Sequence, residues 1–158
     1  MNVSLRGGLA LAVITAIACT SPAATTSPET NGARASLPPG FPVGSWTNTL
    51  TGDDLRAAGV SDPADLRQAG PQTLTFSADG TWTHVSPNAR PDPVFRGRIV
   101  VTGADKFEMH TIFPTELVGE VVTIRWRVEN GALLLDTLDA PHPVITAQME
   151  AHPWSPAH

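Results

Sequence analysis

The sequence predicts an all-β fold: an antiparallel barrel of eight strands, with a short helical insert between the first two strands. Beyond Gly40, most segments alternate apolar and polar residues, which is the period-2 pattern of strands buried on one face. Turn pairs such as Asp79-Gly80 and Asn130-Gly131 separate these segments and supply the positive φ angles of tight hairpins. Antiparallel strands without long crossovers must hide their edges, and closure into a barrel does so completely, with a two-sheet sandwich as the alternative.

Eight segments carry the strand pattern. They are 45–51, 72–77, 81–85, 94–102, 106–113, 121–129, 132–138 and 144–150. The clearest is 121–129, where Ile124 and Trp126 share one face and Arg125 lies on the other. This division predicts one side of the sheet against a core and the other in water.

The segment 51–70 breaks the alternation and predicts two short helices. The first covers Asp53–Ala58 and ends at a glycine, and the second begins at Asp62-Pro63, an N-cap followed by a first-turn proline. Leu55 and Leu66 give the two turns an apolar side. We therefore expect this insert to pack across one mouth of the barrel.

The first 18 residues, 1–18, have the pattern of a secretory signal peptide. Arg6 precedes an apolar run that is too short to span a bilayer, since a transmembrane helix needs about 20 apolar residues. The following Ala16-Ile17-Ala18-Cys19 resembles the lipobox of bacterial lipoproteins, in which the cysteine is acylated and becomes the first residue of the mature chain. Cys19 is the only cysteine, and acylation would remove a reactive thiol from an oxidising compartment. We expect lipidation of Cys19, with a secreted protein carrying an incidental cysteine as the alternative.

Residues 19–39 are rich in Pro, Ser, Thr and Ala and contain almost no large apolar side chains. Such a segment buries too little surface to offset the entropy of ordering it, so we expect a flexible tether. Residues 40–158 are long enough for one domain with its own core. The expected arrangement is an extracytoplasmic barrel, anchored by its lipid to the outer face of the cell membrane.

The chain has ten Lys and Arg residues against 15 Asp and Glu residues, which gives a net charge of −5. There is no basic run, so a nucleic-acid partner is not expected. Lys106 is the only lysine, and this preference for arginine, together with the Ala, Pro and Gly content, indicates a GC-rich bacterial genome.

The residues that open the first predicted strand carry a family resemblance. Gly44-Ser45-Trp46 resembles the Gly-x-Trp signature of the lipocalin and wider calycin families, where the tryptophan plugs the closed end of the barrel. The helical insert, the stretches LTFSADGTW and IRWRVENGALLL, and a late His-Pro-Trp follow in the order seen in small actinobacterial lipocalin-like proteins. The resemblance implies a lipocalin-like barrel over residues 40–158 that Trp46 closes at one end.

Residue patterns typical of catalysis or metal binding are absent from the sequence. The five histidines are not at ligand spacing, there is no HExxH or paired cysteine, and there is no Gly-x-Ser-x-Gly or phosphate loop. Asp53 and Asp54 lie in the first turn of a predicted helix, where the helix dipole accounts for them. His84 is expected to be partly buried with one hydrogen bond. We therefore expect no metal, no cofactor and no enzyme activity.

The aromatic residues suggest a binding function instead. A barrel of this size holds either its own side chains or one small ligand, so a filled core and a cavity remain equal alternatives. The hypothesis is a lipoprotein that binds a small apolar or amphipathic ligand, with Leu55 or Leu66 as the gate. The proposed contacts are Phe76, Trp82, Phe95, Gly97, Phe107, Met109 and Trp126. The alternatives are a module whose outer face, with Arg96 and Arg98, docks a protein partner and, third, an uncharacterised enzyme.

Overall fold

The computed structural model describes residues 37–89 and 92–158, and these form eight strands and four short helical segments. The strands are β1 (Gly44–Leu50), β2 (Gly70–Phe76), β3 (Thr81–Val85), β4 (Val94–Val101), β5 (Lys106–Phe113), β6 (Val121–Glu129), β7 (Ala132–Asp139) and β8 (Ser155–Pro156). The helices are α1 (Gly52–Ala57), α2 (Pro63–Leu66) and α3 (Pro143–Glu150), with the 3₁₀ turn η1 (Thr115–Leu117). The predicted signal peptide, Cys19 and most of the predicted tether lie outside the described residues.

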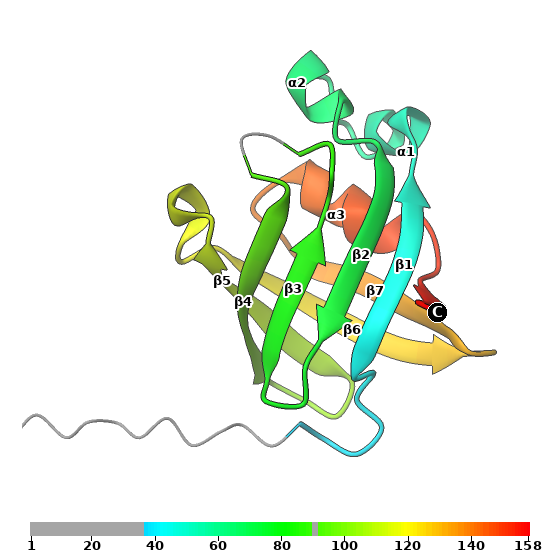
Figure 1. Cartoon of the computed structure of the whole chain (residues 1–158), viewed down its shortest axis with the longest axis vertical. Coiled ribbons are helices and arrows are strands. Elements are labelled where there is room, and N and C mark those ends of the chain that lie inside the picture. The colour runs from blue at the N-terminus through cyan, green and yellow to red at the C-terminus, as the bar shows by residue number, and fades with distance from the viewer. Residues whose placement is uncertain (1–36, 90–91) are drawn as a thin grey trace, which may run out of the picture. The chain divides into compact units, whose positions relative to one another are not determined.

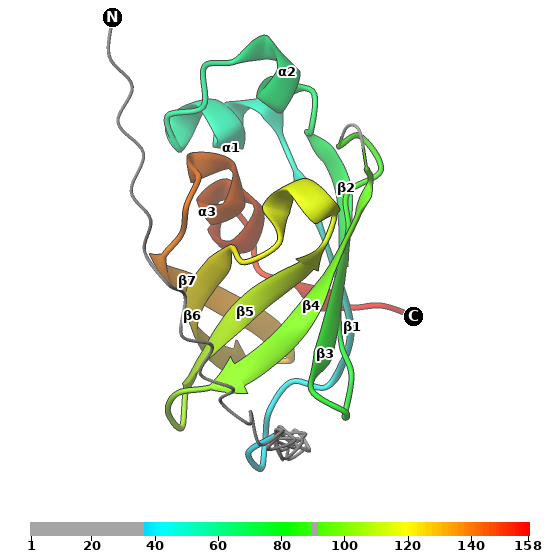
Figure 2. The same ribbon diagram turned by 90° about the vertical axis from the view of Figure 1, so that its left-hand side faces the viewer.

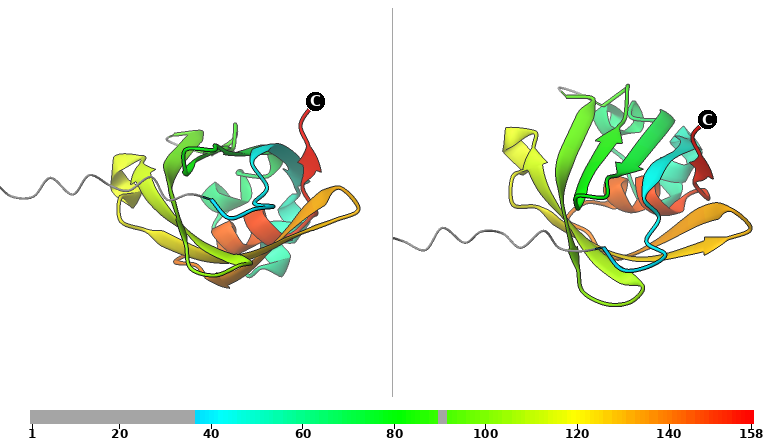
Figure 3. Two further views of the ribbon diagram at one scale, coloured as in Figure 1. Left: turned by 90° about the horizontal axis from the view of Figure 1, so that it is seen from below. Right: turned by 60° about the horizontal axis from the view of Figure 1, so that its bottom comes forward.

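The strands make one antiparallel sheet that curves into a nearly closed barrel (Figures 1 and 3). The order is β7-β6-β5-β4-β3-β2-β1-β8, so each strand from β1 to β7 pairs with its neighbour in sequence. The two edges meet where Leu133 and Trp154 exchange backbone hydrogen bonds of 2.9 and 2.8 Å. This bridge covers part of the open edges, as a barrel requires and a two-sheet sandwich does not.

Seven of the eight predicted strands are present with bounds shifted by two residues or fewer, but the prediction of a strand over 144–150 is wrong. This segment is α3, with Pro143 in its first turn, and the eighth strand is Ser155–Pro156. Val144, Ala147 and Gln148 are all buried, which matches the spacing of one helix face. The β-branched residues of this segment gave a strand-like pattern, and packing of the helix face overrode it.

The predicted helical insert between the first two strands is confirmed as α1 and α2. Thr51 caps α1 by accepting the Asp54 backbone N–H at 3.1 Å, and Asp62 caps α2 by accepting that of Ala64 at 2.7 Å. Both helices lie beyond one end of the barrel (Figure 2). In the described part of the chain, no helix is long and apolar enough to cross a membrane.

Helix α3 joins the insert to the barrel. It packs against α1 and β7. A small buried cluster, separate from the main core, joins α3 to α1 and the end of β1; it consists of Leu50, Leu55, Val60, Val144 and Ala147. Seen from below, α3 lies across the far end of the barrel (Figure 3). The cluster therefore fixes a helical layer over this end.

The segment before β1 lies at the opposite end of the barrel (Figure 1). Phe41 contacts Phe76, Phe107 and Trp126 edge-on, with ring centroids 5.4, 5.3 and 5.6 Å away. Trp46 belongs to the same core cluster, and its Nε1 donates to the Pro42 carbonyl oxygen at 2.9 Å. These aromatic contacts leave the helix-covered end as the place for a cavity.

Candidate ligand-binding pocket

A pocket of about 360 Å³ lies between the helix-covered ends of the strands and the helices above them. Its apolar walls come from the strands and α3, and include Trp82, Phe95, Met109, Val122, Ile145 and Met149. Binding pockets for small molecules have volumes of about 300–1,000 Å³ and are mostly apolar with a few polar groups. The pocket thus has the size and character of a site for one small molecule.

Three of the seven residues predicted to contact ligand line this pocket, namely Trp82, Phe95 and Met109. Phe76, Phe107 and Trp126 instead lie around Phe41 at the other end of the barrel, outside the pocket lining. Sequence reasoning missed Phe41, whose only signal is an isolated aromatic residue just before the first strand.

Gly97, the seventh predicted contact, is buried beneath Trp82 and does not line the pocket. A Cβ atom on Gly97 would overlap the His110 carbonyl oxygen and would lie 2.5 Å from Trp82 Nε1. The strand register also shifts between Arg96 and Gly97. The absent side chain therefore makes room for the indole of Trp82, and Trp82 in turn forms part of the pocket wall.

The two predicted gate residues do not line the pocket either. Leu55 is fully buried in the cluster between α1 and α3, and Leu66 packs against the same cluster. Their neighbours Asp65 and Gln68 do line the pocket. The helical insert thus reaches the pocket through polar side chains, while its leucines anchor it to α3.

His84 is a buried, neutral histidine in the pocket wall. Its Nε2 lies 2.9 Å from Gln72 Oε1, and the Gln72 amide nitrogen donates to two backbone carbonyl oxygens at 3.3 Å. Gln72 Oε1 is therefore an acceptor, His84 Nε2 carries the hydrogen, and Nδ1 is left as an acceptor. Burial lowers the pKa of His84 to about 4, so the imidazole is uncharged at neutral pH.

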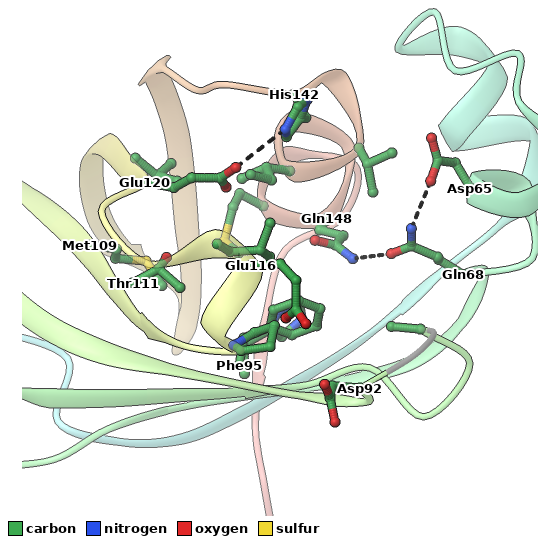
Figure 4. Close-up of a pocket in the computed structure, with 18 of the residues that line it drawn as sticks. Asp65, Gln68, Asp92, Phe95, Met109, Thr111, Glu116, Glu120, His142 and Gln148 are labelled. Atoms are coloured by element: carbon green, nitrogen blue, oxygen red, sulfur yellow. Dashed lines mark hydrogen bonds and ion pairs between the residues drawn. The ribbon is translucent and has the colours of Figure 1, made fainter.

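Four carboxylates line the mouth of the pocket (Figure 4). They are Asp65 on α2, Asp92 before β4, Glu116 on η1 and Glu120 before β6. Glu120 lies 3.4 Å from His142 Nε2. Sequence reasoning missed all four, because they come from separate loops and helices that only the folded chain brings together.

The adjacent Asp53 and Asp54 take no part in the pocket. Asp54 Oδ2 accepts hydrogen bonds from Thr51 Oγ1 and Thr51 N, at 2.5 and 2.8 Å, and these bonds hold the Asp54 pKa below its usual value. Asp53 pairs with Arg56 at 2.7 Å. The two carboxylates therefore support the start of α1. Among residues 37–89 and 92–158, no group of three or more His, Cys, Asp or Glu side chains could hold a metal ion.

Comparison with known proteins supplies no relative for this chain. No family model, curated protein or solved structure matches it. The function of the pocket is therefore inferred from its own shape and chemistry.

Proposed function

We propose that this protein binds one small apolar or amphipathic molecule in the pocket beneath α3. The main support for this function is a pocket of about 360 Å³ with apolar walls, at the barrel end opposite the aromatic cluster around Phe41. A ligand there would bury apolar surface against Phe95, Met109 and Met149, and each buried methylene contributes about 0.8 kcal/mol.

The proposed function includes a cellular location, at the outer face of the cell membrane. The signal-peptide pattern, the lipobox-like residues before Cys19 and the resemblance to lipocalin-like proteins together support an extracytoplasmic lipoprotein. Two acyl chains on the cysteine would give stable anchoring, because one chain alone binds a membrane only marginally. The barrel would then work close to a lipid surface, which is a source of amphipathic molecules.

Replacing Cys19 with Ala tests the anchor. We expect the wild-type protein to fractionate with membranes and to incorporate labelled fatty acid, whereas the Cys19→Ala protein should appear in the medium. Retention of the variant in the membrane fraction, or absence of label on the wild-type protein, would contradict the lipoprotein proposal.

A matched pair of phenylalanine variants tests the pocket. Phe95 lines it and is half-buried, whereas Phe107 is fully buried beside Phe41 and lies outside it. In titrations of the purified, unlipidated protein with 1-octanol, followed by tryptophan fluorescence, we expect Phe95→Ala to raise the Kd roughly fivefold. Phe107→Ala should lower the free energy of unfolding by about 3–5 kcal/mol and leave the Kd of the folded protein nearly unchanged.

The reverse result, with weaker binding only in Phe107→Ala, would place the ligand at the other end of the barrel. Absence of saturable binding by the wild-type protein would overturn the binding function and favour the alternative in which the outer face docks a protein partner.

A further inference from the structure

Four acidic side chains outside the pocket pair with arginines, whereas others, such as Asp54 and Glu108, lie beside histidines. Asp53 pairs with Arg56 on α1 at 2.7 Å, and on the barrel Asp105 pairs with Arg125 at 3.4 Å and Asp136 with Arg127 at 2.6 Å. Between described residues, no ion pair joins Asp65, Asp92, Glu116 or Glu120 to a lysine or arginine.

Among the described residues that line the pocket, the acidic side chains are therefore these four, and the one base beside any of them is His142, the neighbour of Glu120. In the view of Figure 4, Glu120, Asp65 and Asp92 lie on three sides of the pocket and Glu116 lies between them. No lysine or arginine stands among the described residues that line it. A cleft lined by one sign of charge, with walls of low dielectric, concentrates the electrostatic potential and attracts counter-ions.

Below this acidic mouth, the deeper wall of the pocket is mainly apolar. Phe95, Met109 and Val122 offer contact to a hydrocarbon or ring, and the neutral His84 leaves Nδ1 as an acceptor. An alkyl carboxylate would bring its negative charge to the acidic mouth, which is unfavourable, while an ammonium group there gains attraction from every carboxylate.

We propose that the ligand of this pocket is a cationic amphiphile, with its apolar body between the strands and α3 and its amine at the mouth beside Glu116 and Asp65. This inference rests on the proposed binding function and adds the charge of the ligand.

Three probes with the same eight-carbon chain test the inference: octylamine, 1-octanol and sodium octanoate. They are titrated at neutral pH and low ionic strength into the purified, unlipidated protein, with chemical shifts of the Met109 and Met149 methyl groups as the readout. We expect octylamine to bind roughly tenfold more tightly than 1-octanol, and octanoate to bind more weakly than 1-octanol. Equal binding of the three probes, or a preference for octanoate, would overturn the inference.

A charge-removing double variant locates the source of the preference. In Asp65→Asn/Glu116→Gln, the preference for octylamine over 1-octanol should fall to about threefold or less. The matched control is Asp105→Asn/Glu129→Gln, which removes the same charge from the turn before β5 and from the end of β6, both outside the pocket lining, and should keep the tenfold preference. A preference that survives in the first variant, or falls equally in both, would overturn the assignment to the pocket mouth.

Binding of the uncharged 1-octanol distinguishes failure of the binding function from failure of the inferred preference for a cation. Unchanged 1-octanol binding in both double variants shows that the pocket is intact and that only the charge preference has changed. If none of the three probes shifts the pocket methyl groups of the wild-type protein, the binding function itself fails, and the inference about charge fails with it.

Discussion

The pocket wall contains a histidine whose charge state depends on the fold. His84 is 3% exposed, its imidazole stacks on Phe95 with centroids 5.8 Å apart, and its one hydrogen bond within the described residues goes to Gln72. Desolvation disfavours the charged form, so the pKa falls from 6.5 to about 4. The sequence suggested a partly buried histidine with one hydrogen bond, and the structure buries it almost completely.

This shift predicts that His84 makes stability depend on pH. Below about pH 6.5 the unfolded chain binds a proton at His84, whereas the folded protein binds it only near pH 4. The stabilising contribution is therefore complete above pH 6.5 and is lost as the pH falls towards 4. Between about pH 7 and pH 5 the loss should be about 2 kcal/mol.

Urea unfolding of the wild type and of His84→Gln measures this contribution. Glutamine can still donate to Gln72 but does not titrate, so the variant should lose less stability than the wild type over the same pH interval. Equal pH dependence in the two proteins would show that His84 is accessible to protons in the folded state.

At the scale of elements, the error over 144–150 shows which sequence signals were given too little weight. The stretch begins with valine, isoleucine and threonine, which favour strands. Pro143, however, is typical of a helix first turn, and the apolar residues Val144 and Ala147 are three apart, as on a helix face. The segment between this helix and the C-terminus supplies β8, whose two residues are too few for a period-2 pattern.

Closure of the barrel depends on the element that follows α3. Trp154 is fully buried, donates from Nε1 to the Met149 carbonyl oxygen at 3.1 Å and bridges to Leu133 of β7. We expect Trp154→Ala to lower the free energy of unfolding by about 3–5 kcal/mol, because it leaves a large cavity.

Amide hydrogen exchange distinguishes loss of closure from general loss of packing. In Trp154→Ala the amide of Leu133, which donates to the Trp154 carbonyl oxygen, should exchange much faster, while the amides between β2 and β3 should change less. The control Trp154→Phe keeps a ring in the site and should show a smaller effect in both measurements. Uniform acceleration of all amides would contradict the role assigned to the bridge.

For the whole molecule, the barrel followed from the sequence because alternation and turn chemistry are local. Strand faces, hairpin turns such as Asn130-Gly131 and the helical insert each depend on a few neighbouring residues. The same local pattern placed Trp82, Phe95 and Met109 on the inner face, and these residues line the pocket.

The position of the pocket along the barrel did not follow from the sequence. Face assignments cannot distinguish the two ends of an inner surface, so Phe76 and Phe107 were grouped with Phe95 although Phe41 packs against them at the opposite end. The acidic mouth depends on four separate segments meeting above the strands. Because the four carboxylates come from separate segments of the sequence, no local sequence pattern predicts that they lie around one pocket.

A methyl NMR titration of the protein with 1-octanol tests whether the pocket beneath α3 is the binding site. We predict saturable shifts confined to pocket methyl groups, those of Met109, Val122 and Met149, with little change at the buried Leu74 and the exposed Ile112. Shifts centred on Ile112, or no saturable shift at the three pocket residues, would contradict the claim that this pocket is the binding site.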